Sequence, residues 1–586
     1  MFLTRLGKRL LALVLAGCLI PATLVGCGTA GGDSGTSQGS MESYAAILAD
    51  RYDEAFPDDL VRTVRILMDD ADWRAMQSNL TAKQYYRADI WIGDEMVEDV
   101  AVRTKGSSSL MSAASSADFR AGLKVDFNFF NAERSYHGIQ KMVYNNGFSD
   151  PTLMKEFLGY ELMALMGVPT PRACFADVWV NESHLGVYTQ VEAIEVSFLS
   201  ANFDDDDGNL YKPEIQAGAL DWTDADVAAE AASVSGSSSA TTTDSFNVGG
   251  GNLVEIIDRL GEDAGWIPGL TGAGHTMTTA AGAQAGGPMA QMGGLFNYNA
   301  DYLTSVGLRT NENYADYSGL YEMLEVLNSD PAEVSTDDLE DVLQVDEVLR
   351  FLAVSVALVH LDNYIGMAHN YYLYEDGGRL WIIPWDLNMT LGGFSSGVSD
   401  DQILNFYIDE PTAARVDEYP LVQQLLDESE YLETYHSYLQ QLIEGPFSVE
   451  TMTARINEIA DLIRPYVEKD DAKFFTTADF EEGLTQNLTS TGSGMQRMGG
   501  SFIGLTYFVE QRTASIAAQL GGALPSGSGD GSGNGGGKGM AAFGINRAGG
   551  GAPPNMQPGL QGQPGPPGGG QTPSGAPPTT VSGDQR

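Results

Sequence analysis

The sequence predicts an α+β fold in which a strand-rich part precedes a largely helical part. Segments that begin at Arg87 and Val97 alternate apolar and polar residues, which approximates the period-two pattern of half-buried strands. The apolar run 345–361 is long enough for a buried helix, and helical patterns also follow Pro420 and cover 502–520. With 586 residues, 43% of them hydrophobic, the chain can form at least one two-lobed domain plus additional segments.

The N-terminus has the pattern of a bacterial export signal. A positively charged stretch precedes an apolar run over 10–25. The stretch Leu24-Val25-Gly26-Cys27 is similar to a lipobox, which implies a diacylglyceryl group on Cys27, whereas cleavage before Cys18 would leave an unusually short apolar region. We therefore predict a lipoprotein signal peptide over 1–26, a flexible tether over 27–56, and a lipid anchor at the outer face of the cell membrane.

The cysteine content and the net charge limit how the protein can be stabilised and which partners it can bind. Only Cys174 of the three cysteines would remain in the folded part, so stability must come from a packed core rather than from disulfides. Asp and Glu number 79 against 32 Lys and Arg, which gives a formal net charge of −47. Such a charge repels nucleic acid and anionic lipid, and it suits cationic partners such as divalent metal ions. A generally acidic, solvated surface explains most of these charges more simply.

In the strand-rich part, one helix is framed by strands. Apolar residues at helical spacing predict an amphipathic helix over 151–166, with Asp150 as its N-cap. The segments 174–180 and 185–191 predict a β-hairpin that ends at Glu192.

Two long segments have a composition that does not predict a packed core. Residues 215–300 are rich in Ala, Gly, Ser and Thr and are interpreted as a mobile insertion. Residues 521–586 are rich in Gly, Pro, Ser and Gln and are interpreted as a disordered tail. The predicted folded parts are therefore 57–214 and 301–520.

The densest group of residues that could carry chemistry lies in the second folded part. Asp362 follows the predicted helix, Asn370 comes eight residues later, and Asp386 follows a short apolar strand. Phosphoryl transfer requires such a set, because one carboxylate orients or deprotonates the attacking hydroxyl while an amide and a second carboxylate hold magnesium. Magnesium prefers oxygen ligands, and the sequence has no clusters of Cys or His with zinc spacing.

Four stretches, taken in order, resemble the CotH family of atypical, kinase-like phosphotransferases. They are Val102-Arg-Thr-Lys-Gly-Ser-Ser-Ser, Gly186-Val-Tyr-Thr-Gln-Val-Glu, Asn209-Leu-Tyr-Lys and Pro384-Trp-Asp-Leu-Asn. Each stretch alone is weak, but the ordered set is specific and extends over nearly all of 60–520. The resemblance implies a two-lobed atypical protein-kinase-like fold, with a strand-rich N-lobe over 57–214 and a helical C-lobe over 301–520. It also implies ATP and magnesium as cofactors, and phosphorylation of Ser or Thr in surface or spore-coat proteins.

The resemblance assigns roles to the residues of the second folded part. Asp362 would be the catalytic carboxylate, Asp386 the metal-binding carboxylate, and Asn370 its amide partner. The family commonly has Asp where this chain has Asn388, and the loss of that charge would weaken a metal site.

Candidate nucleotide-binding residues lie in the first folded part. Lys124 would bind phosphate, although a solvated strand lysine is an equally good interpretation. Glu156 or Glu161 would pair with Lys124, and the alternative for both is a surface position on an amphipathic helix. Lys105 lies in a Gly/Ser loop that could cradle phosphate or be an ordinary turn. Glu192 lies where a kinase hinge would hold adenine, or it is a structural cap.

Two other classes of function remain open. A non-catalytic (pseudokinase) cell-surface scaffold or adhesin is favoured by Asn388 and by the scarcity of ATP outside the cell, whereas Lys124, Asp362, Asn370 and Asp386 favour an enzyme. A nuclease or metal hydrolase would use similar carboxylates, but the sequence lacks the histidines or close carboxylates of two-metal sites. The expected partners are a protein substrate and, through the lipid alone, the membrane; nucleic acid is not expected.

Overall fold

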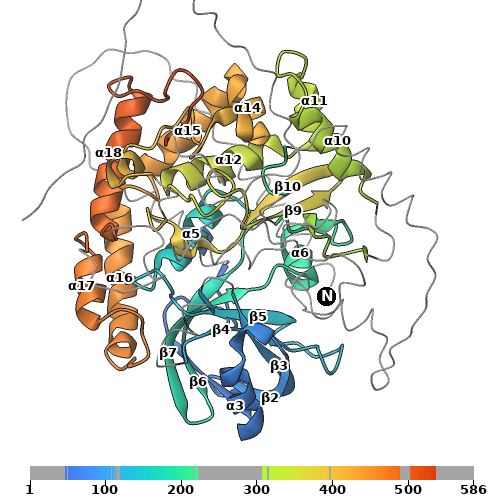
Figure 1. Cartoon of the computed structure of the whole chain (residues 1–586), viewed down its shortest axis with the longest axis vertical. Helices are drawn as coiled ribbons and strands as arrows, with labels where there is room; N and C mark the ends of the chain where they lie inside the picture. Colours follow the sequence, from blue (N-terminus) through green and yellow to red (C-terminus); the bar gives the residue numbers. More distant parts are fainter. Residues whose placement is uncertain are drawn as a thin grey trace, which may run out of the picture. The chain divides into compact units, whose positions relative to one another are not determined.

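The computed structural model contains both strands and helices, so the α+β prediction is confirmed (Figure 1). It describes residues 47–48, 51–106, 109–110, 113, 119–214, 217–221, 306–312, 316–394, 398–488 and 502–535, all of which belong to one compact unit. The predicted signal peptide with Cys27, most of the 215–300 insertion and most of the tail lie outside the described residues.

In the described ranges, the strands are β1 (Arg62–Met68), β2 (Tyr86–Ile92), β3 (Glu95–Lys105), β4 (Gly122–Asp126), β5 (Lys141–Asn145), β6 (Ala173–Val180), β7 (Ser183–Glu192), β8 (Leu210–Tyr211), β9 (Tyr371–Asp376) and β10 (Arg379–Pro384). The helices are α3 (Asp70–Ser78), α5 (Lys155–Leu165), α6 (Val196–Asn202), α10 (Ser318–Leu327), α11 (Thr336–Val342), α12 (Val345–Ala357), α13 (Asp400–Leu404), α14 (Pro420–Asp427), α15 (Ser429–Glu444), α16 (Val449–Val467), α17 (Thr477–Gly483) and α18 (Leu505–Leu520). Short 3-10 helices are η1 (Leu80–Ala82), η5 (Leu387–Met389) and η6 (Val416–Glu418).

The first seven strands form a closed barrel in the order β1-β2-β3-β4-β5-β7-β6. Neighbouring strands are antiparallel except β1 and β6, which pair in parallel with Arg62 opposite Ala176. Alternate residues such as Val64, Ile90 and Val102 fill the interior. Closure leaves the barrel without an exposed strand edge, and it presents the remaining side chains of each strand on its outer face.

The hairpin predicted over 174–191 is confirmed as β6 and β7, which pair from Val180 opposite Ser183 to Ala173 opposite Val191. Asn181 in the turn has a φ of 51°, a left-handed conformation that asparagine tolerates better than most residues.

Helix α5 differs from its prediction in its start and in its surroundings. The Asp150 carboxylate does not cap the helix but accepts hydrogen bonds from the backbone N–H groups of Thr152 and Lys155, both at 2.8 Å, and so holds a turn before it. The expected exposed face is absent from α5, since Glu156 is 3% exposed and Glu161 is 4% exposed. The reason is that α5 packs against η5, α12 and β6.

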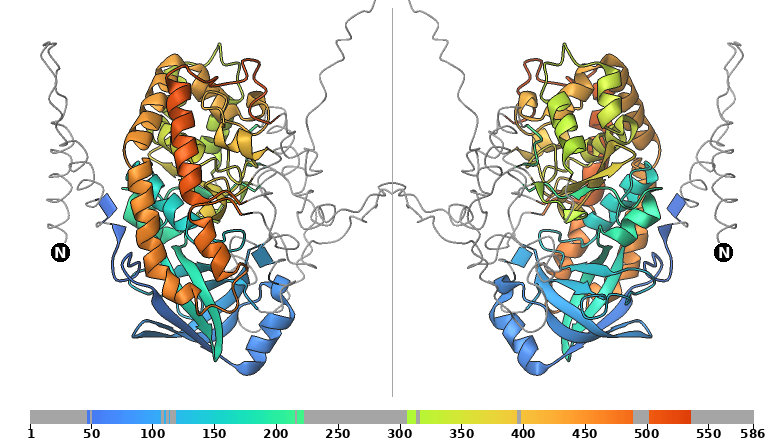
Figure 2. Two further views of the ribbon diagram at one scale, coloured as in Figure 1. Left: turned by 90° about the vertical axis from the view of Figure 1, so that its left-hand side faces the viewer. Right: turned by 90° about the vertical axis from the view of Figure 1, so that its right-hand side faces the viewer.

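The helical part is organised around α12, which packs against α15, α18 and β10. The predicted buried helix over 345–361 is confirmed, although it ends at Ala357. A three-stranded sheet, β10-β9-β8, joins the short strand β8 to the later hairpin. Figure 2 shows α16 and α18 side by side, and α16 also contacts β7 of the barrel. None of the helices in the described ranges is long and apolar enough to cross a membrane.

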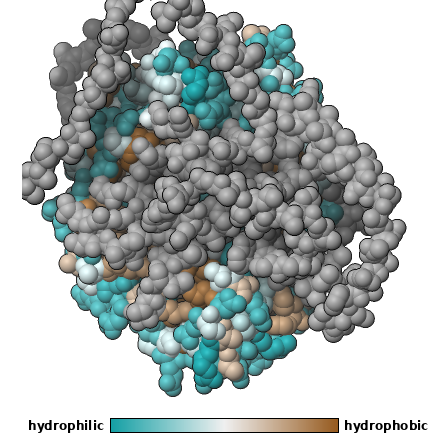
Figure 3. All heavy atoms as spheres, viewed as in Figure 1, coloured by the Kyte–Doolittle hydropathy of each residue, from teal (hydrophilic) through white to brown (hydrophobic). Residues whose placement is uncertain are grey.

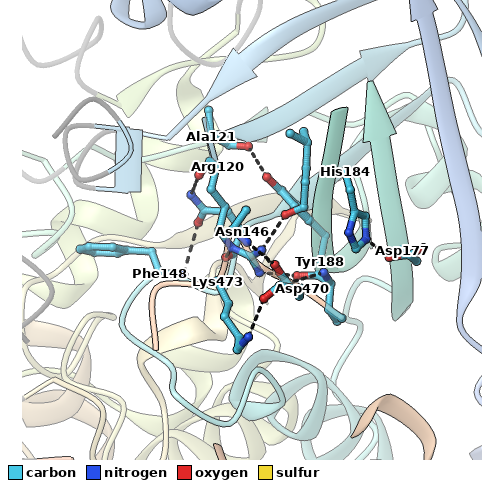
Figure 4. A network of polar contacts seen from close by, with 12 residues as sticks. Arg120, Ala121, Asn146, Phe148, Asp177, His184, Tyr188, Asp470 and Lys473 are labelled. Atoms are coloured by element: carbon cyan, nitrogen blue, oxygen red, sulfur yellow. Dashed lines mark hydrogen bonds and ion pairs between the residues drawn. The ribbon is translucent and has the colours of Figure 1, made fainter. Parts of the chain in front are cut away.

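A buried ion pair joins the barrel to the end of α16 (Figure 4). Arg120 Nη1 lies 2.7 Å from Asp470 Oδ2, and both side chains are fully buried. Arg120 also donates to the carbonyl oxygens of Asn146, Leu185 and Val187 at 2.6–2.8 Å. The backbone N–H of Val187 donates to the same Asp470 oxygen at 3.0 Å. This one guanidinium therefore connects the strand β7, the loop after β5 and the segment after α16.

Part of the predicted tail is packed against the helical domain. In the segment 521–535, the backbone N–H groups of Gly529 and Gly533 donate to the Glu410 carboxylate at 2.8 and 3.3 Å. Gly533 has a φ of 67°, and a Cβ atom there would lie 2.1 Å from the Ala414 carbonyl oxygen. Glycine, which the composition associates with disorder, is needed here because the backbone wraps closely around a carboxylate.

The visible surface of the described residues is mainly hydrophilic, as the net charge of −47 leads one to expect (Figure 3). Large apolar side chains that are exposed on the barrel include Leu67, Trp91 and Met96.

Candidate active site

Lys105 and Lys124 extend from the same outer face of the barrel. The β3–β4 register places Lys105 opposite Gly122 and Arg103 opposite Lys124, while Val102 and Leu123 point into the barrel. The two lysines therefore lie close together on neighbouring strands, but they have different partners.

Lys105 is connected to Glu156 through an amide. Lys105 Nζ donates to Asn145 Oδ1 at 2.8 Å, and Asn145 Nδ2 donates to Glu156 Oε1 at 2.7 Å. An asparagine side chain can bridge a cation and a carboxylate because it carries both an acceptor and a donor. The lysine–glutamate link expected in a kinase-like site thus involves Lys105 rather than Lys124, with Asn145 between the two charges.

Lys124 and Glu161 take part in other ion pairs. Lys124 Nζ lies 3.8 Å from Glu195, which also pairs with Lys141 at 2.8 Å. Glu161 pairs with Arg455 of α16 at 2.6 Å and accepts a hydrogen bond from the Tyr52 hydroxyl at 2.5 Å. The structure therefore does not bring Lys124 to either helix glutamate.

Glu192 is held by an arginine. Arg172 donates to its two carboxylate oxygens at 2.9 and 2.8 Å, and Arg172 also contacts Asp53 at 2.7 Å. These contacts attach the end of β7 to the segment before β1, which agrees with the structural interpretation of this glutamate.

The residues Asp362, Asn370 and Asp386 come together at one end of the β9–β10 hairpin. Tyr371 lies opposite Pro384, so Asn370 just before β9 and Asp386 just after β10 are at the same end. The backbone N–H of Trp385 donates to the Asn370 carbonyl oxygen at 3.1 Å. Asn370 Nδ2 donates to the carbonyl oxygen of Asp362 at 2.8 Å and to its Oδ2 at 3.1 Å.

The backbone at this end of the hairpin is in the left-handed region. Asn370 has a φ of 58° and Asp386 a φ of 56°. Asn and Asp adopt this conformation more readily than other residues with a side chain, and such conformations cluster at functional sites. Asp386 is fixed further by its backbone N–H, which donates to the Tyr160 hydroxyl of α5 at 3.1 Å.

The electrostatics of the site reflect unbalanced negative charge. Burial and the nearby charge of Asp386 raise the pKa of Asp362 well above its ordinary value. Burial and Asp386 also raise the pKa of Glu156 to about 8, although Lys105 and Asn145 oppose the shift. Three carboxylates therefore share a region whose negative charge a bound cation would stabilise.

The donor set fits a magnesium ion held jointly by protein and substrate. Asp386 Oδ1 is buried and has no hydrogen-bond partner among the described residues. The amide nitrogen of Asn370 is used by Asp362, which leaves its oxygen for another ligand. In the described ranges, no group of three or more His, Cys, Asp or Glu side chains could hold a metal ion by itself. Magnesium is commonly bound by one or two side chains together with substrate phosphates, and Asp386 with Asn370 would meet that need.

Comparison with known proteins shows which family the chain belongs to. Residues 102–248 and 295–516, more than half of the chain, match the family model described as CotH kinase protein. The chain belongs to this family. It is also 23% identical over 347 residues to the inner spore coat protein H of Bacillus subtilis (strain 168), an alignment that covers 59% of this chain and 73% of that protein.

Several residues near the CotH-family motifs were not assigned roles from the sequence. His369 Nε2 lies 3.4 Å from Asp362 Oδ1, and Asn145 bridges the charges of Lys105 and Glu156. Lys212 Nζ lies 5.9 Å from the centre of the Trp385 ring. Lys212 and Trp385 belong to two of the motif stretches, so the motifs could have pointed to them. No sequence pattern pointed to Asn145, because only the folded chain brings it between β3 and α5.

Gly159 allows α5 to approach η5, which follows Asp386. A Cβ atom at Gly159 would lie 2.8 Å from Leu387 Cδ2 and 3.1 Å from Leu387 Cβ. Gly→Ala in a helix ordinarily stabilises by about 0.5–1 kcal/mol, but overpacking costs about 1–3 kcal/mol. We expect Gly159→Ala to lower the free energy of unfolding, as measured by urea denaturation.

The matched control for this prediction removes the clash from the other side. With Leu387→Ala in the same chain, the loss of unfolding free energy should be smaller than the sum of the two single losses, because the two side chains compete for one space. Strictly additive losses in the double variant would contradict the proposed role of the close approach.

Proposed function

We propose that the protein is an extracytoplasmic atypical protein kinase that transfers the terminal phosphoryl group of ATP to Ser or Thr of surface or spore-coat proteins. The barrel would serve as the N-lobe of a two-lobed kinase-like domain, and the helical part as its C-lobe. The carrying observation is that Asp386 is close enough to interact electrostatically with two connected sets of polar residues. One set is Lys105, Asn145 and Glu156, and the other is Asp362 and Asn370.

Each residue would have a distinct role in the proposed reaction. Lys105, oriented through Asn145 and Glu156, would bind the donor phosphates, while Asp386 and Asn370 would hold magnesium. Magnesium, when bound, neutralises charge on the phosphates. Asp362, fixed by the Asn370 amide and close to His369, would orient the substrate hydroxyl and accept its proton.

The proposed substrate class and location rest on the family and on the N-terminal sequence. The relative from Bacillus subtilis is named an inner spore coat protein, which supports a coat or surface protein as the phosphate acceptor. The lipobox-like stretch that ends at Cys27 supports a lipid anchor at the outer face of the cell membrane. A second candidate function, a non-catalytic surface scaffold, is favoured by Asn388, where the family commonly has Asp.

Isothermal titration of the mature chain with ATP, with and without magnesium, tests the proposal. We expect magnesium-dependent binding in the wild type and a loss of at least about tenfold in affinity for Asp386→Ala, because this variant removes a metal ligand. Asp417→Ala, an exposed aspartate outside the site, is the matched control and should bind like the wild type. An absence of wild-type binding at millimolar ATP would refute the kinase proposal and favour the scaffold.

A further inference from the structure

Lys212 is held beside the hairpin that carries Asp386. It directly follows β8, whose Tyr211 pairs with Leu373 of β9. The Lys212 backbone N–H donates to the Gly307 carbonyl oxygen at 3.0 Å. A Cβ atom at Gly307 would lie 2.8 Å from the Lys212 carbonyl oxygen, so the two backbones are in close contact. The position of Lys212 is therefore set by backbone contacts on two sides.

Two lysines from different parts of the fold converge on one indole. Lys212 Nζ lies 5.9 Å from the centre of the Trp385 ring and 5.4 Å from that of Tyr372, whereas Lys105 Nζ lies 5.2 Å from the Trp385 ring. Trp385 is 3% exposed and immediately precedes Asp386. The two ammonium groups consequently lie near the proposed metal ligand.

The lysines differ in which catalytic residues they approach. Lys105 is linked to Glu156 through Asn145, on the barrel side of the site. Lys212 is close enough to His369 for the two side chains to interact electrostatically. His369 in turn contacts Asp362 at 3.4 Å. Lys212 therefore lies on the side of the site where the hydroxyl acceptor would be activated.

Among the described residues neither lysine is in direct contact with a carboxylate: Lys105 reaches Glu156 only through the Asn145 amide, and Lys212 contacts aromatic rings. Both side chains are partly buried. Contact with an aromatic ring stabilises an ammonium group by about 0.5–2 kcal/mol, which replaces only part of its lost hydration. Two ammonium groups without a direct carboxylate contact, beside a proposed magnesium-binding carboxylate, match a ligand with several negative charges that also brings magnesium, such as the triphosphate of the proposed donor.

We propose that Lys212 is a further catalytic residue, which contacts the phosphoryl group as it passes from ATP to the acceptor. The inference rests on the proposed kinase function. In this step the acceptor hydroxyl oxygen forms a bond to the terminal phosphorus, the bond from that phosphorus to the bridging oxygen breaks, and ADP leaves with the bonding electrons. The hydroxyl proton goes to Asp362. Lys212 stabilises the negative charge on the oxygens of the transferred group, which is the role a cation has in other phosphoryl transfers.

The test compares Lys212→Met and Lys105→Met in the mature chain. The acceptor probe is a peptide library in which each member has a single Ser or Thr, and the donor is ATP labelled in its terminal phosphate. Lys212→Met should reduce kcat by at least about 100-fold and change the affinity for ADP by less than about threefold, since ADP lacks the group that Lys212 contacts. Lys105→Met should weaken binding of both ATP and ADP.

Two further variants separate a catalytic role from a structural one. Lys212→Arg keeps the charge and should recover part of kcat, even if Lys212→Met is less stable. Lys469→Met, at an exposed lysine after α16, makes the same charge change elsewhere and should behave like the wild type.

Two outcomes would overturn the inference in distinguishable ways. Unchanged kcat in Lys212→Met, or an equal loss of ADP and ATP affinity, would refute the role of Lys212 while leaving the kinase proposal intact. A wild-type chain that neither binds nor transfers phosphate from ATP would refute both.

Discussion

Asp470→Ala is expected to lower the free energy of unfolding by about 3–5 kcal/mol, because removing one partner of a buried ion pair leaves the other charge uncompensated. Arg120 and Asp470 are both fully buried and 2.7 Å apart, and their contacts connect the barrel to the segment after α16. The variant would leave the Arg120 guanidinium with neutral carbonyl partners only. Urea denaturation followed by circular dichroism measures the change.

An exposed ion pair provides the matched control. Arg415 and Asp417 lie at a similar distance, 2.8 Å, but their side chains are 55% and 52% exposed. Solvent screens such pairs, so Asp417→Ala should leave the denaturation midpoint essentially unchanged. If Asp470→Ala also left the denaturation midpoint unchanged, the buried ion pair would not be what joins the two parts of the fold.

The sequence predicted several individual elements of the fold but not how the strands pair. Period-two and helical patterns are local, so they identified the β6–β7 hairpin and α12. Barrel closure depends on β1 pairing in parallel with β6, and these strands are more than one hundred residues apart. Composition was misleading for 521–535, because the glycines there are needed to wrap the backbone around Glu410.

The two halves of the candidate site differed in how far the sequence could predict them. Asp362, Asn370 and Asp386 flank one hairpin, so their proximity follows from local structure. Lys105 and Lys124 lie on the same face of neighbouring strands, and their residue types alone do not reveal which one reaches α5. The polar residues of α5 looked like a solvated helix face, yet Glu156 is buried because its partners come from β3 and β5.

Asp362→Asn is expected to slow phosphoryl transfer by about 100- to 10,000-fold while ATP binding is retained, because an amide cannot accept the hydroxyl proton. Asp386 remains available to hold magnesium in this variant. Burial and Asp386 raise the pKa of Asp362 well above its ordinary value, and a base must be deprotonated to act. In the wild type, kcat should therefore fall as the pH drops through this raised pKa, and the residual activity of Asp362→Asn should lack this dependence. Steady-state kinetics over a pH series measures both effects.

The matched control is Asp376→Asn, which makes the same chemical change at the far end of β9, where Asp376 lies opposite Arg379. This variant should keep the wild-type kcat and pH profile. A parallel loss of ATP affinity and rate in Asp362→Asn would assign Asp362 to the metal rather than to the proton. An unchanged rate would exclude it as the base, and the partner that orients it, Asn370, would then serve the metal alone. Whether Asp362→Asn loses ATP affinity as well as rate, or rate alone, thus decides whether Asp362 binds the metal or accepts the proton.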